Sequence, residues 1–422
     1  MSQSGHKQSE DMPYSYRKSW TLNMCTTTSP SRILAMFVLS VWLAPATAGE
    51  QASKPRALQL NWELAIADSR ERPSPQLPAR ILQTGSGELI AVGSMIVPLN
   101  RRGPGEITWL DTKALILDAA LDSKGNIWAG GRINQRAWFP GADMADAYLG
   151  KFSQNGKKLA EFTFGGLSWR QIVALHPSRD GGVLVTGPTK GGTWVARISD
   201  QGKISWEKTF GFGAIAAITE GRDGNIAFVG LRKADSTSHP YEEEAVFWLF
   251  NPQGKALTEQ VIRPSINAHR SMRYEAISIE ASPDGYFALV RWGNPSDDKP
   301  LTVTKVSLTG TVQWSVPLRH TATPWPGRSA VWKKCNQEHA LLANGDLLVT
   351  CSIEGEIVLS RLDGTSGMEK TQRVALPSCH EKRGAVITPL PVKENSVLLF
   401  GSRPSNNVAA SCSWLAEWGL EP

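Results

Sequence analysis

The sequence has no uninterrupted apolar segment long enough to cross a membrane. Its longest apolar run, residues 33–44, has 12 residues, whereas a membrane-spanning helix needs roughly 20. The chain also has no P-loop, no G-x-S-x-G nucleophile elbow and no sialidase-type Asp-box. These absences argue against a membrane-spanning protein and against three familiar classes of active site.

Cysteine is scarce, and its few copies are not arranged as metal ligands. The chain has five cysteines and no C-x-x-C pair or Cys/His cluster, so we expect no zinc site. Cys335, Cys351, Cys379 and Cys412 remain once the N-terminal segment is removed. An even number of cysteines in an exported protein favours disulfides. We predict the pairs Cys335–Cys351 and Cys379–Cys412, with Cys335–Cys379 as the main alternative.

The sequence also lacks a strong excess of either charge. It has 45 Lys/Arg and 39 Asp/Glu, a net charge of +6. Because residues 1–48 hold four of these cations and two of the anions, residues 49–422 have 41 against 37, a net charge of +4. Nucleic-acid binding usually needs a concentrated basic stripe, so nucleic acid is not an expected partner.

The N-terminal residues have the composition of a secretory signal. A polar stretch with several cations precedes the apolar run 33–44, and Ala46-Thr47-Ala48 follows it. These are the n-region, h-region and cleavage site of a signal peptide. We therefore predict a signal peptide over 1–48, cut after Ala48, and a periplasmic or secreted single domain over 49–422. An uncleaved membrane anchor is the alternative, and Met24 is an alternative start.

A strand–turn–strand pattern recurs seven times after the signal. One clear copy is ALILDAALDSKGNIWAGGR at 114–132, where apolar alternation flanks a glycine-containing turn. A second hairpin follows most copies, as in TWVARISDQGKISWEKTF at 193–210. Two hairpins make one four-stranded propeller blade. The other copies of the first hairpin begin at residues 79, 172, 214, 276, 340 and 385.

These repeats predict an all-β fold, a seven-bladed β-propeller. The last copy has no clear fourth strand, whereas ALQLNWELAI at 57–66 has no first hairpin of its own. We expect this N-terminal strand to complete the last blade and close the ring. The unit at 79–113 is degenerate in its second half, which leaves six or eight blades as alternatives.

The segments KFSQNGKKLAEFTFGG and ISDQGKISWEKTFG, each followed by an apolar strand and an RDG turn, resemble repeats of the quinoprotein-like bacterial propellers. The resemblance covers most of residues 57–420 and implies an exported propeller. The quinone-dependent dehydrogenases of that superfamily use adjacent cysteines and acidic residues around calcium. This chain has no adjacent cysteine pair and no matching acidic set, so we expect no cofactor and no metal.

The strand order predicts that the tight turns share one face of the disc and the long connections share the other. Ser123–Asn126 and Arg179–Gly182 are examples of the tight turns. The long connections include 133–146, 263–275 and 319–339. Binding residues usually concentrate in long loops on a rigid scaffold, so we expect the binding site on the long-loop face.

Arginine and aromatic residues are frequent in these long connections. Together they suit flat, partly anionic surfaces through bidentate hydrogen bonds and stacking. The alternative for each tryptophan is packing between blades, and for each arginine simple solvation. His269, His320 and His380 would form a further site only if they converged. The predicted contact set is Arg136, Trp138, Arg270, Arg273, Tyr274, Trp325, Arg328 and Trp332.

The pattern as a whole predicts an exported binding or scaffold protein that docks an acidic protein partner or an anionic glycan. No catalytic residue is assigned, and the balance is against an enzyme. The alternative is a polysaccharide lyase or hydrolase at the mouth of the channel, which requires histidine and carboxylate side chains that converge near the axis. An immunity-type protein against a delivered toxin is a third hypothesis. The oligomeric state is left open.

Overall fold

The computed structural model describes a set of segments that all belong to the unit Ala48–Pro422. The predicted signal peptide 1–48 lies outside the described residues and stays a prediction. The described residues are 58–62, 80–100, 103–139, 142–165, 170–211, 215–233, 243–263, 273–293, 301–318, 339–353, 356–375, 386–393, 396–403 and 412–419.

Every regular element in these segments is a β-strand, and the strands form seven antiparallel sheets. The first three sheets follow one another along the chain. Sheet 1 contains β2 (Arg80–Gln83), β3 (Leu89–Val92), β4 (Met95–Asn100), β5 (Gly103–Pro104) and β6 (Thr108–Trp109). Sheet 2 contains β7 (Leu115–Leu121), β8 (Ile127–Phe139), β9 (Ala142–Phe152) and β10 (Lys158–Phe164). Sheet 3 contains β11 (Ala174–Pro177), β12 (Val183–Thr189), β13 (Gly192–Ile198) and β14 (Ile204–Gly211).

The remaining four sheets continue the same plan, and only the last one includes a strand from far away in the sequence. Sheet 4 contains β15 (Ile215–Glu220), β16 (Ile226–Lys233), β17 (Glu243–Phe250) and β18 (Ala256–Ile262). Sheet 5 contains β19 (Arg273–Ser282), β20 (Gly285–Gly293), β21 (Leu301–Ser307) and β22 (Val312–Pro317). Sheet 6 contains β23 (His339–Leu341), β24 (Leu347–Ile353), β25 (Glu356–Leu362) and β26 (Glu369–Ala375). Sheet 7 contains β27 (Val386–Lys393), β28 (Ser396–Arg403), β29 (Cys412–Gly419) and β1 (Leu58–Trp62).

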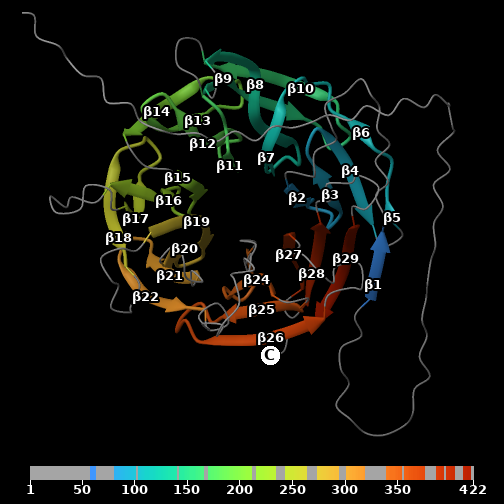
Figure 1. The fold of residues 1–422 in the computed structure, drawn as a ribbon, viewed down its shortest axis with the longest axis vertical. Coiled ribbons are helices and arrows are strands. Elements are labelled where there is room, and N and C mark those ends of the chain that lie inside the picture. The colour runs from blue at the N-terminus through green and yellow to red at the C-terminus, as the bar shows by residue number, and fades with distance from the viewer. Residues whose placement is uncertain are drawn as a thin grey trace, which may run out of the picture. The chain divides into compact units, whose positions relative to one another are not determined.

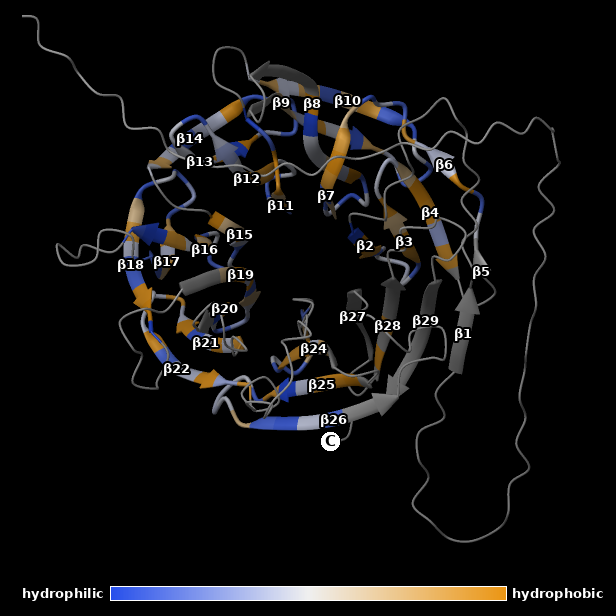
Figure 2. Ribbon diagram, in the orientation of Figure 1, coloured by the Kyte–Doolittle hydropathy of each residue, from blue (hydrophilic) through white to orange (hydrophobic). Residues whose placement is uncertain are grey.

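The sheets stand around a common centre, with the first strand of each sheet innermost (Figure 1). Neighbouring sheets touch through these inner strands, as β7 touches β11 and β15 touches β19. The core lies between sheets, because one hydrophobic cluster joins Trp128 and Leu149 of sheet 2 to Val185 and Trp194 of sheet 3. Apolar residues run along strands such as β4, β7 and β22 (Figure 2). The predicted all-β propeller class is confirmed.

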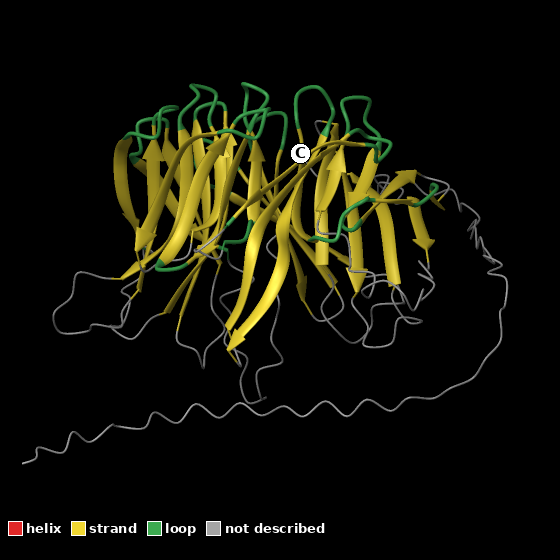
Figure 3. Cartoon of the chain, turned by 90° about the horizontal axis from the view of Figure 1, so that it is seen from above, coloured by secondary structure: helices red, strands yellow, loops and turns green. Residues whose placement is uncertain are grey.

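The predicted hairpins are also confirmed, since each repeat forms paired strands joined by a short turn. The backbone N–H of Asp122 donates to Asn126 O at 2.9 Å, and that of Ser178 donates to Gly182 O at 2.9 Å. Gly125 has a φ of 79° in the first of these turns, a conformation that glycine adopts at no steric cost. The described turns gather at one end of the disc (Figure 3), which we call the tight-turn face; the opposite end is the crossover face.

One predicted loop is wrong. The segment 133–146, expected to be a long loop, is the extension of a hairpin in which β8 and β9 continue with Arg136 opposite Met144. Ile133, Trp138 and Phe139 have high strand propensity, and a continued ladder gives backbone N–H and C=O groups their partners. The register is irregular between Ile133 and Arg136, so the extension is not an ideal ladder.

A repeated contact joins each of sheets 1 to 5 to the sheet that follows it. Trp206 on the outer strand of sheet 3 lies against the turn glycine Gly254 of sheet 4, where an added Cβ would meet the indole at 2.8 Å. Trp314 of sheet 5 covers Gly367 of sheet 6 in the same way, also at 2.8 Å. Both glycines have positive φ, 78° and 71°. We call these contacts seams. The other seams are Thr108 on Gly156, Phe162 on Gly202 and Thr258 on Gly310.

Sheet 7 combines strands that lie far apart in the sequence. β1 pairs antiparallel with β29, and Leu60 lies opposite Leu415. Sheet 1 departs from the four-strand plan, because the short strands β5 and β6 both pair with β4. This agrees with the degenerate second half predicted for residues 79–113. Among the described residues no helix has the length and apolar character needed to cross a bilayer.

Candidate functional site

The predicted contact residues are only partly described. Arg270, Trp325, Arg328 and Trp332 lie outside the described residues. The four others lie on strands, with Arg136 and Trp138 on β8 and Arg273 and Tyr274 at the start of β19. Tyr274 is opposite Trp292 in the register, and Arg273 is opposite Gly293. These two were expected in a loop, and the start of the β19–β20 ladder includes them instead; the contact set itself stays a prediction.

The predicted disulfides can be followed at two of the four cysteines. Cys351 lies on β24, is fully buried and is disulfide-bonded. Cys412 is the first residue of β29 and lies opposite Arg403. Cys335 and Cys379 lie outside the described residues. The pairing of the four cysteines therefore stays a prediction.

Buried cations hold the tight turns of four sheets. Lys151 Nζ lies 3.1 Å from Asp122 Oδ2, and Arg197 Nη2 lies 3.0 Å from Asp180 Oδ2. Each cation lies on the third strand of its sheet, one residue before the last residue that pairs with a neighbouring strand. Its aspartate lies in the turn between the first and second strands of the same sheet. Equivalent pairs are Lys305 with Asp284 at 2.6 Å and Arg361 with Asp346 at 2.7 Å. These pairs are structural, because each cation is largely enclosed.

Sheet 4 lacks this cation. Leu249 has the register position that the cations occupy elsewhere. The hydroxyl of Tyr286, from sheet 5, donates instead to Asp223 Oδ1 at 3.4 Å. Burial raises the pKa of Tyr286, and the charge of Asp223 raises it further. The phenol therefore stays protonated and can donate its proton in the hydrogen bond to Asp223.

A different group of titratable residues lies on the innermost strands, one from each of six sheets. They surround the axis of the ring, because the first strand of each sheet is nearest the centre (Figure 1). Arg80, His176 and His339 come from three different sheets, and each lowers the pKa of Glu280 in a fourth sheet. Such an influence requires the charges to lie near one another. The full group, which we call the axial cluster, is Arg80, Asp118, His176, Glu220, Glu280 and His339.

Within the axial cluster, His339 contacts two residues of β19. Its Nε2 lies 3.1 Å from Ser278 Oγ and 3.5 Å from Glu280 Oε2. A nucleophile relay needs the hydroxyl on one ring nitrogen and the carboxylate on the other. Here both groups meet the same nitrogen, so the arrangement is not a serine-nucleophile relay. The carboxylate is 39% exposed, which leaves it accessible from the axis.

The other acidic members of the cluster are held by backbone and cation partners. Asp118 Oδ2 accepts a hydrogen bond from Leu175 N at 2.8 Å, and Oδ1 lies 3.4 Å from Arg80 Nε. Burial nevertheless raises the pKa of Asp118 above its usual value. Glu220 Oε2 accepts from Ser178 Oγ at 3.1 Å and from Arg179 N at 2.8 Å. These contacts tie the axis to the tight-turn face.

The pKa values of His176 and Glu280 are both lowered, but for different reasons. Burial lowers the pKa of His176, although the nearby charges of Glu280 and Glu220 oppose this effect. Burial alone raises the pKa of Glu280, but the hydrogen bond and the charge of His339 outweigh it, so that the pKa is lowered. At neutral pH the axis therefore presents a neutral imidazole beside an ionised carboxylate.

The protonation of His176 predicts a loss of stability in mild acid. Because its folded pKa lies below the ordinary value of 6.5, the unfolded chain binds the proton first as the pH falls. The free energy of unfolding should then decrease below pH 6.5, by at most about 1.4 kcal/mol per pH unit for one proton. Urea denaturation of the wild type and His176→Asn at pH 7 and 5 tests this. A variant that loses as much stability as the wild type would contradict it.

Sequence reasoning missed the axial cluster. The predicted contact residues all belong to segments expected to be long connections. His176 and Glu280 instead lie inside apolar strands, two residues before the turns that begin at Ser178 and Ser282. A charged or histidine residue within an otherwise apolar first strand was the available signal. The proposed convergence of His269, His320 and His380 concerns residues outside the described part.

The described residues contain no group of three or more His, Cys, Asp or Glu side chains able to hold a metal ion. His339 and Glu280 contribute one ligand each, and Ser278 is a poor third ligand for most protein-bound metals.

Comparison with known proteins finds similar structures but no sequence family. No protein-family model matches the chain, and no curated protein matches it in sequence. A protein from Lactobacillus plantarum has a similar crystal structure, with 15% identity, a TM-score of 0.50 and coverage of 72% of this chain and 87% of that one. A likeness at this identity concerns the fold alone, which the arrangement of the sheets shows to be a propeller.

Two further structures are similar at a lower level. The Dos1 propeller is 7% identical, with a TM-score of 0.48 over 81% of this chain and 78% of that one. The polysaccharide lyase Uly1 is 10% identical, with a TM-score of 0.49 over 85% of this chain and 95% of that one. At such identities the propeller's ligand and activity have to be inferred from its own residues.

Proposed function

We propose that this propeller is an exported binding protein that docks an acidic protein or an anionic glycan on its crossover face. The proposal includes a ring of seven blades closed by β1, an architecture like that of the quinoprotein-like propellers without their cofactor. The strand–turn–strand repeat supports the architecture, and the pairing of β1 with β29 supports the closure. The signal-like residues 1–48 support export.

The observation that carries the proposal is a local concentration of positive charge in the sequence of three successive crossovers. Three successive crossovers, 264–272, 319–338 and 376–385, connect sheets 4 to 7. Together they carry seven Lys/Arg and two Asp/Glu, a net charge of +5. Sheets 4, 5, 6 and 7 are neighbours, because β15 touches β19, β19 touches β23 and β23 touches β27.

Among the connections of sheets 4 to 7 the excess is confined to these three crossovers, since the connections 234–242, 294–300 and 354–355 carry one Lys and five Asp/Glu, and the tight turns show no excess either. The turns of sheets 2 to 6 hold six Lys/Arg and seven Asp/Glu. At the other face, Arg263 directly precedes the first of the three crossovers and has 75% of its side chain exposed, with one ion pair at 3.4 Å to Glu244. A patch of one charge sign steers an oppositely charged partner and raises its association rate.

Replacement of three crossover-face arginines should remove binding. Arg270, Arg273 and Arg328 changed together to alanine should weaken the retained ligand by at least about tenfold. The measurement is a pull-down from periplasmic extract with residues 49–422, followed by titration of the recovered partner and of an anionic polysaccharide panel. Binding should also weaken as salt rises, because the charges are exposed.

A matched control removes the same charge from the opposite face. Lys157, Lys203 and Lys255 are exposed residues of three tight turns, and their triple alanine variant should bind like the wild type. Equal binding by both triple variants would refute the proposal. One observation favours the rival enzyme, namely the contact of His339 with Glu280 near the axis. Release of shortened polysaccharide in the same panel would establish that rival instead.

A further inference from the structure

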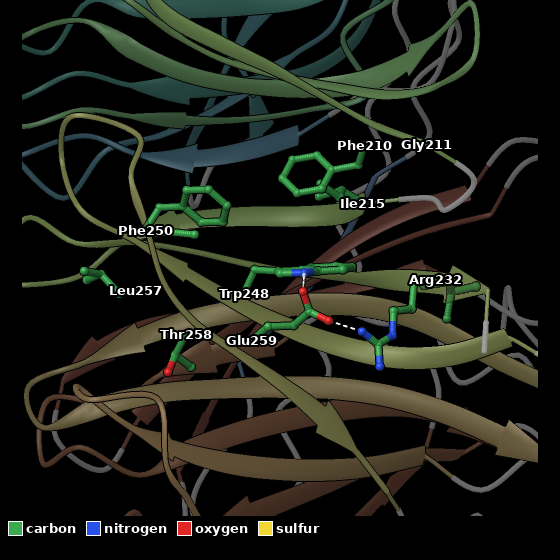
Figure 4. A pocket seen from close by; sticks show the side chains of 11 residues that line it. Phe210, Gly211, Ile215, Arg232, Trp248, Phe250, Leu257, Thr258 and Glu259 are labelled. Atoms are coloured by element: carbon green, nitrogen blue, oxygen red, sulfur yellow. Dashed lines mark hydrogen bonds and ion pairs between the residues drawn. The ribbon is translucent and has the colours of Figure 1, made fainter. Parts of the chain in front are cut away.

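A cavity of about 470 Å³ opens between sheets 3 and 4, away from the axial cluster. Sites of this size with an apolar lining and a few polar groups are typical of ligand pockets. Figure 4 shows Glu259 between the indole of Trp248 and the guanidinium of Arg232. The residues that matter here are Phe210, Arg232, Trp248, Phe250, Leu257 and Glu259.

The polar end of this cavity has a defined set of hydrogen bonds. Trp248 Nε1 donates to Glu259 Oε2 at 3.0 Å, and Arg232 donates to the other oxygen, Oε1. Arg232 is also held by Glu244, whose Oε2 lies 3.1 Å from Nη2. Arg232 is therefore bound at the edge of the cavity. Glu259 is 45% exposed, and its Oε2 accepts only the bond from Trp248 among the described residues.

Sheet 3 contains the same three residue types in a closed arrangement. Trp194 Nε1 donates to Glu207 Oε2 at 2.8 Å, and Arg170 Nη1 donates to the same oxygen at 2.7 Å. The guanidinium carbon of Arg170 lies 4.8 Å from the centroid of the Trp194 ring. Trp194 is fully buried under this cation. Sheet 3 thus shows that a Trp–Glu pair of this kind can bind an arginine side chain.

The two glutamates are structurally equivalent. Glu207 lies opposite Ala196, two residues before Ile198 ends β13, and Glu259 lies opposite Trp248, two residues before Phe250 ends β17. The tryptophans differ by two residues along their strands when counted from these ends. An even offset keeps both on the same face of the sheet. Sheet 4 therefore has the tryptophan and the carboxylate, but the cation that would cover the indole is absent from the described residues.

We propose that the cavity between sheets 3 and 4 binds a guanidinium group, supplied by an arginine side chain of a partner. The guanidinium would donate to Glu259 Oε2, as Arg170 does to Glu207 in sheet 3, and would pack against the small part of Trp248 that lines the cavity. Trp248 is 6% exposed, and the centroid of the Phe210 ring lies 5.6 Å from that of its indole. A planar guanidinium gains from both contacts at once, and a carboxylate oxygen accepts more than one hydrogen bond. Leu257, which is 49% exposed, would pack against the aliphatic part of the arginine. This site does not depend on the proposed function.

The test uses indole N–H signals of the ¹⁵N-tryptophan-labelled mature protein, assigned with Trp248→Phe and Trp194→Phe. The probe is Nα-acetyl-arginine amide, compared with the isosteric but uncharged citrulline derivative and with free arginine. We expect the Trp248 signal to move with the arginine amide at millimolar concentration and not with the citrulline amide. The Trp194 signal should stay unchanged. The blocked amide resembles an arginine residue within a polypeptide. Tighter binding of the amide than of free arginine therefore indicates that the guanidinium comes from a protein.

Two variants make the outcome decisive. Glu259→Gln should weaken the response of Trp248 by about tenfold, because one charge-assisted hydrogen bond is lost. Arg170→Ala should create a second responsive site, in which the Trp194 signal now moves with the probe. An unchanged Trp248 signal in the wild type, or an equal response to the citrulline amide, would overturn the proposal. The new response of Trp194 expected in Arg170→Ala tests the proposal even if the Glu259→Gln variant fails to fold.

Discussion

Replacement of Lys305 by alanine is expected to lower the free energy of unfolding by about 2–5 kcal/mol, mainly the cost of truncating a fully buried long side chain, with a smaller part from the ion pair to Asp284, whose side chain is 61% exposed. Lys305 is fully buried, with its Nζ 2.6 Å from Asp284 Oδ1 and 4.0 Å from the centroid of the Phe287 ring. Without the ammonium group, Asp284 loses the hydrogen bond and the positive charge that together keep its pKa low against the effect of burial. Urea denaturation followed by circular dichroism measures the loss.

Two comparisons separate the charge pair from simple loss of volume. Lys305→Met keeps the length of the side chain and should recover part of the lost stability, because apolar replacements of buried ion pairs are often tolerated. Lys203→Ala removes an exposed lysine of a tight turn and should change stability by less than about 0.5 kcal/mol. A Lys305→Ala variant as stable as Lys203→Ala would show that the buried pair is not stabilising.

Gly131→Ala is expected to cost more than about 4 kcal/mol, the range of severe single substitutions. Gly131 lies on β8 opposite Ile116, next to a register shift in β7. An added Cβ would lie 2.8 Å from the carbonyl carbon of Leu115, 3.0 Å from Ile116 Cα and closest to the Leu115 carbonyl oxygen. Backbone atoms of a ladder cannot move aside as a side chain does, so the inner strand must be displaced.

Gly85→Ala is the matched control for this substitution. Gly85 has nothing within 4 Å of an added Cβ, so its replacement should change stability by less than about 1 kcal/mol. Gly187→Ala should behave like Gly131→Ala, because its Cβ would meet Gln171 of the preceding segment in the same manner. A midpoint of urea unfolding for Gly131→Ala close to that of Gly85→Ala would contradict the close approach.

The hairpins were predictable from sequence because they depend on local information. Period-2 alternation places one face of each strand in the core, and turns such as Asp122–Asn126 and Ser178–Gly182 use glycine where the φ is positive. The boundary of 133–146 was not predictable in the same way. Its polar and aromatic residues fit either a loop or a strand, and the pairing of β8 with β9 decides between them.

The buried cations were visible in the sequence but were not recognised. Lys151, Arg197 and Lys305 each stand five residues before the turn glycine of their second hairpin, and Leu249 stands at the same distance from Gly254. A cation that recurs at a fixed distance from a turn, with an aspartate in the preceding turn, predicts a paired position. For the axial cluster the sequence offered only single polar residues within apolar first strands. Their convergence had no local signal, because the members come from six separate repeats.

The seams bear on how a chain of this kind can be inherited and rearranged. In sheets 1 to 5 a residue on the outer strand, bulky in some sheets and small in others, lies against a turn glycine of the following sheet, as Trp206 lies against Gly254 and Thr258 against Gly310. A duplicated or transplanted repeat would bring its outer residue against a turn that evolved beside another neighbour. Recombination between repeats is therefore constrained at the junction more than within the unit, and the order of repeats should be harder to change than their individual sequences.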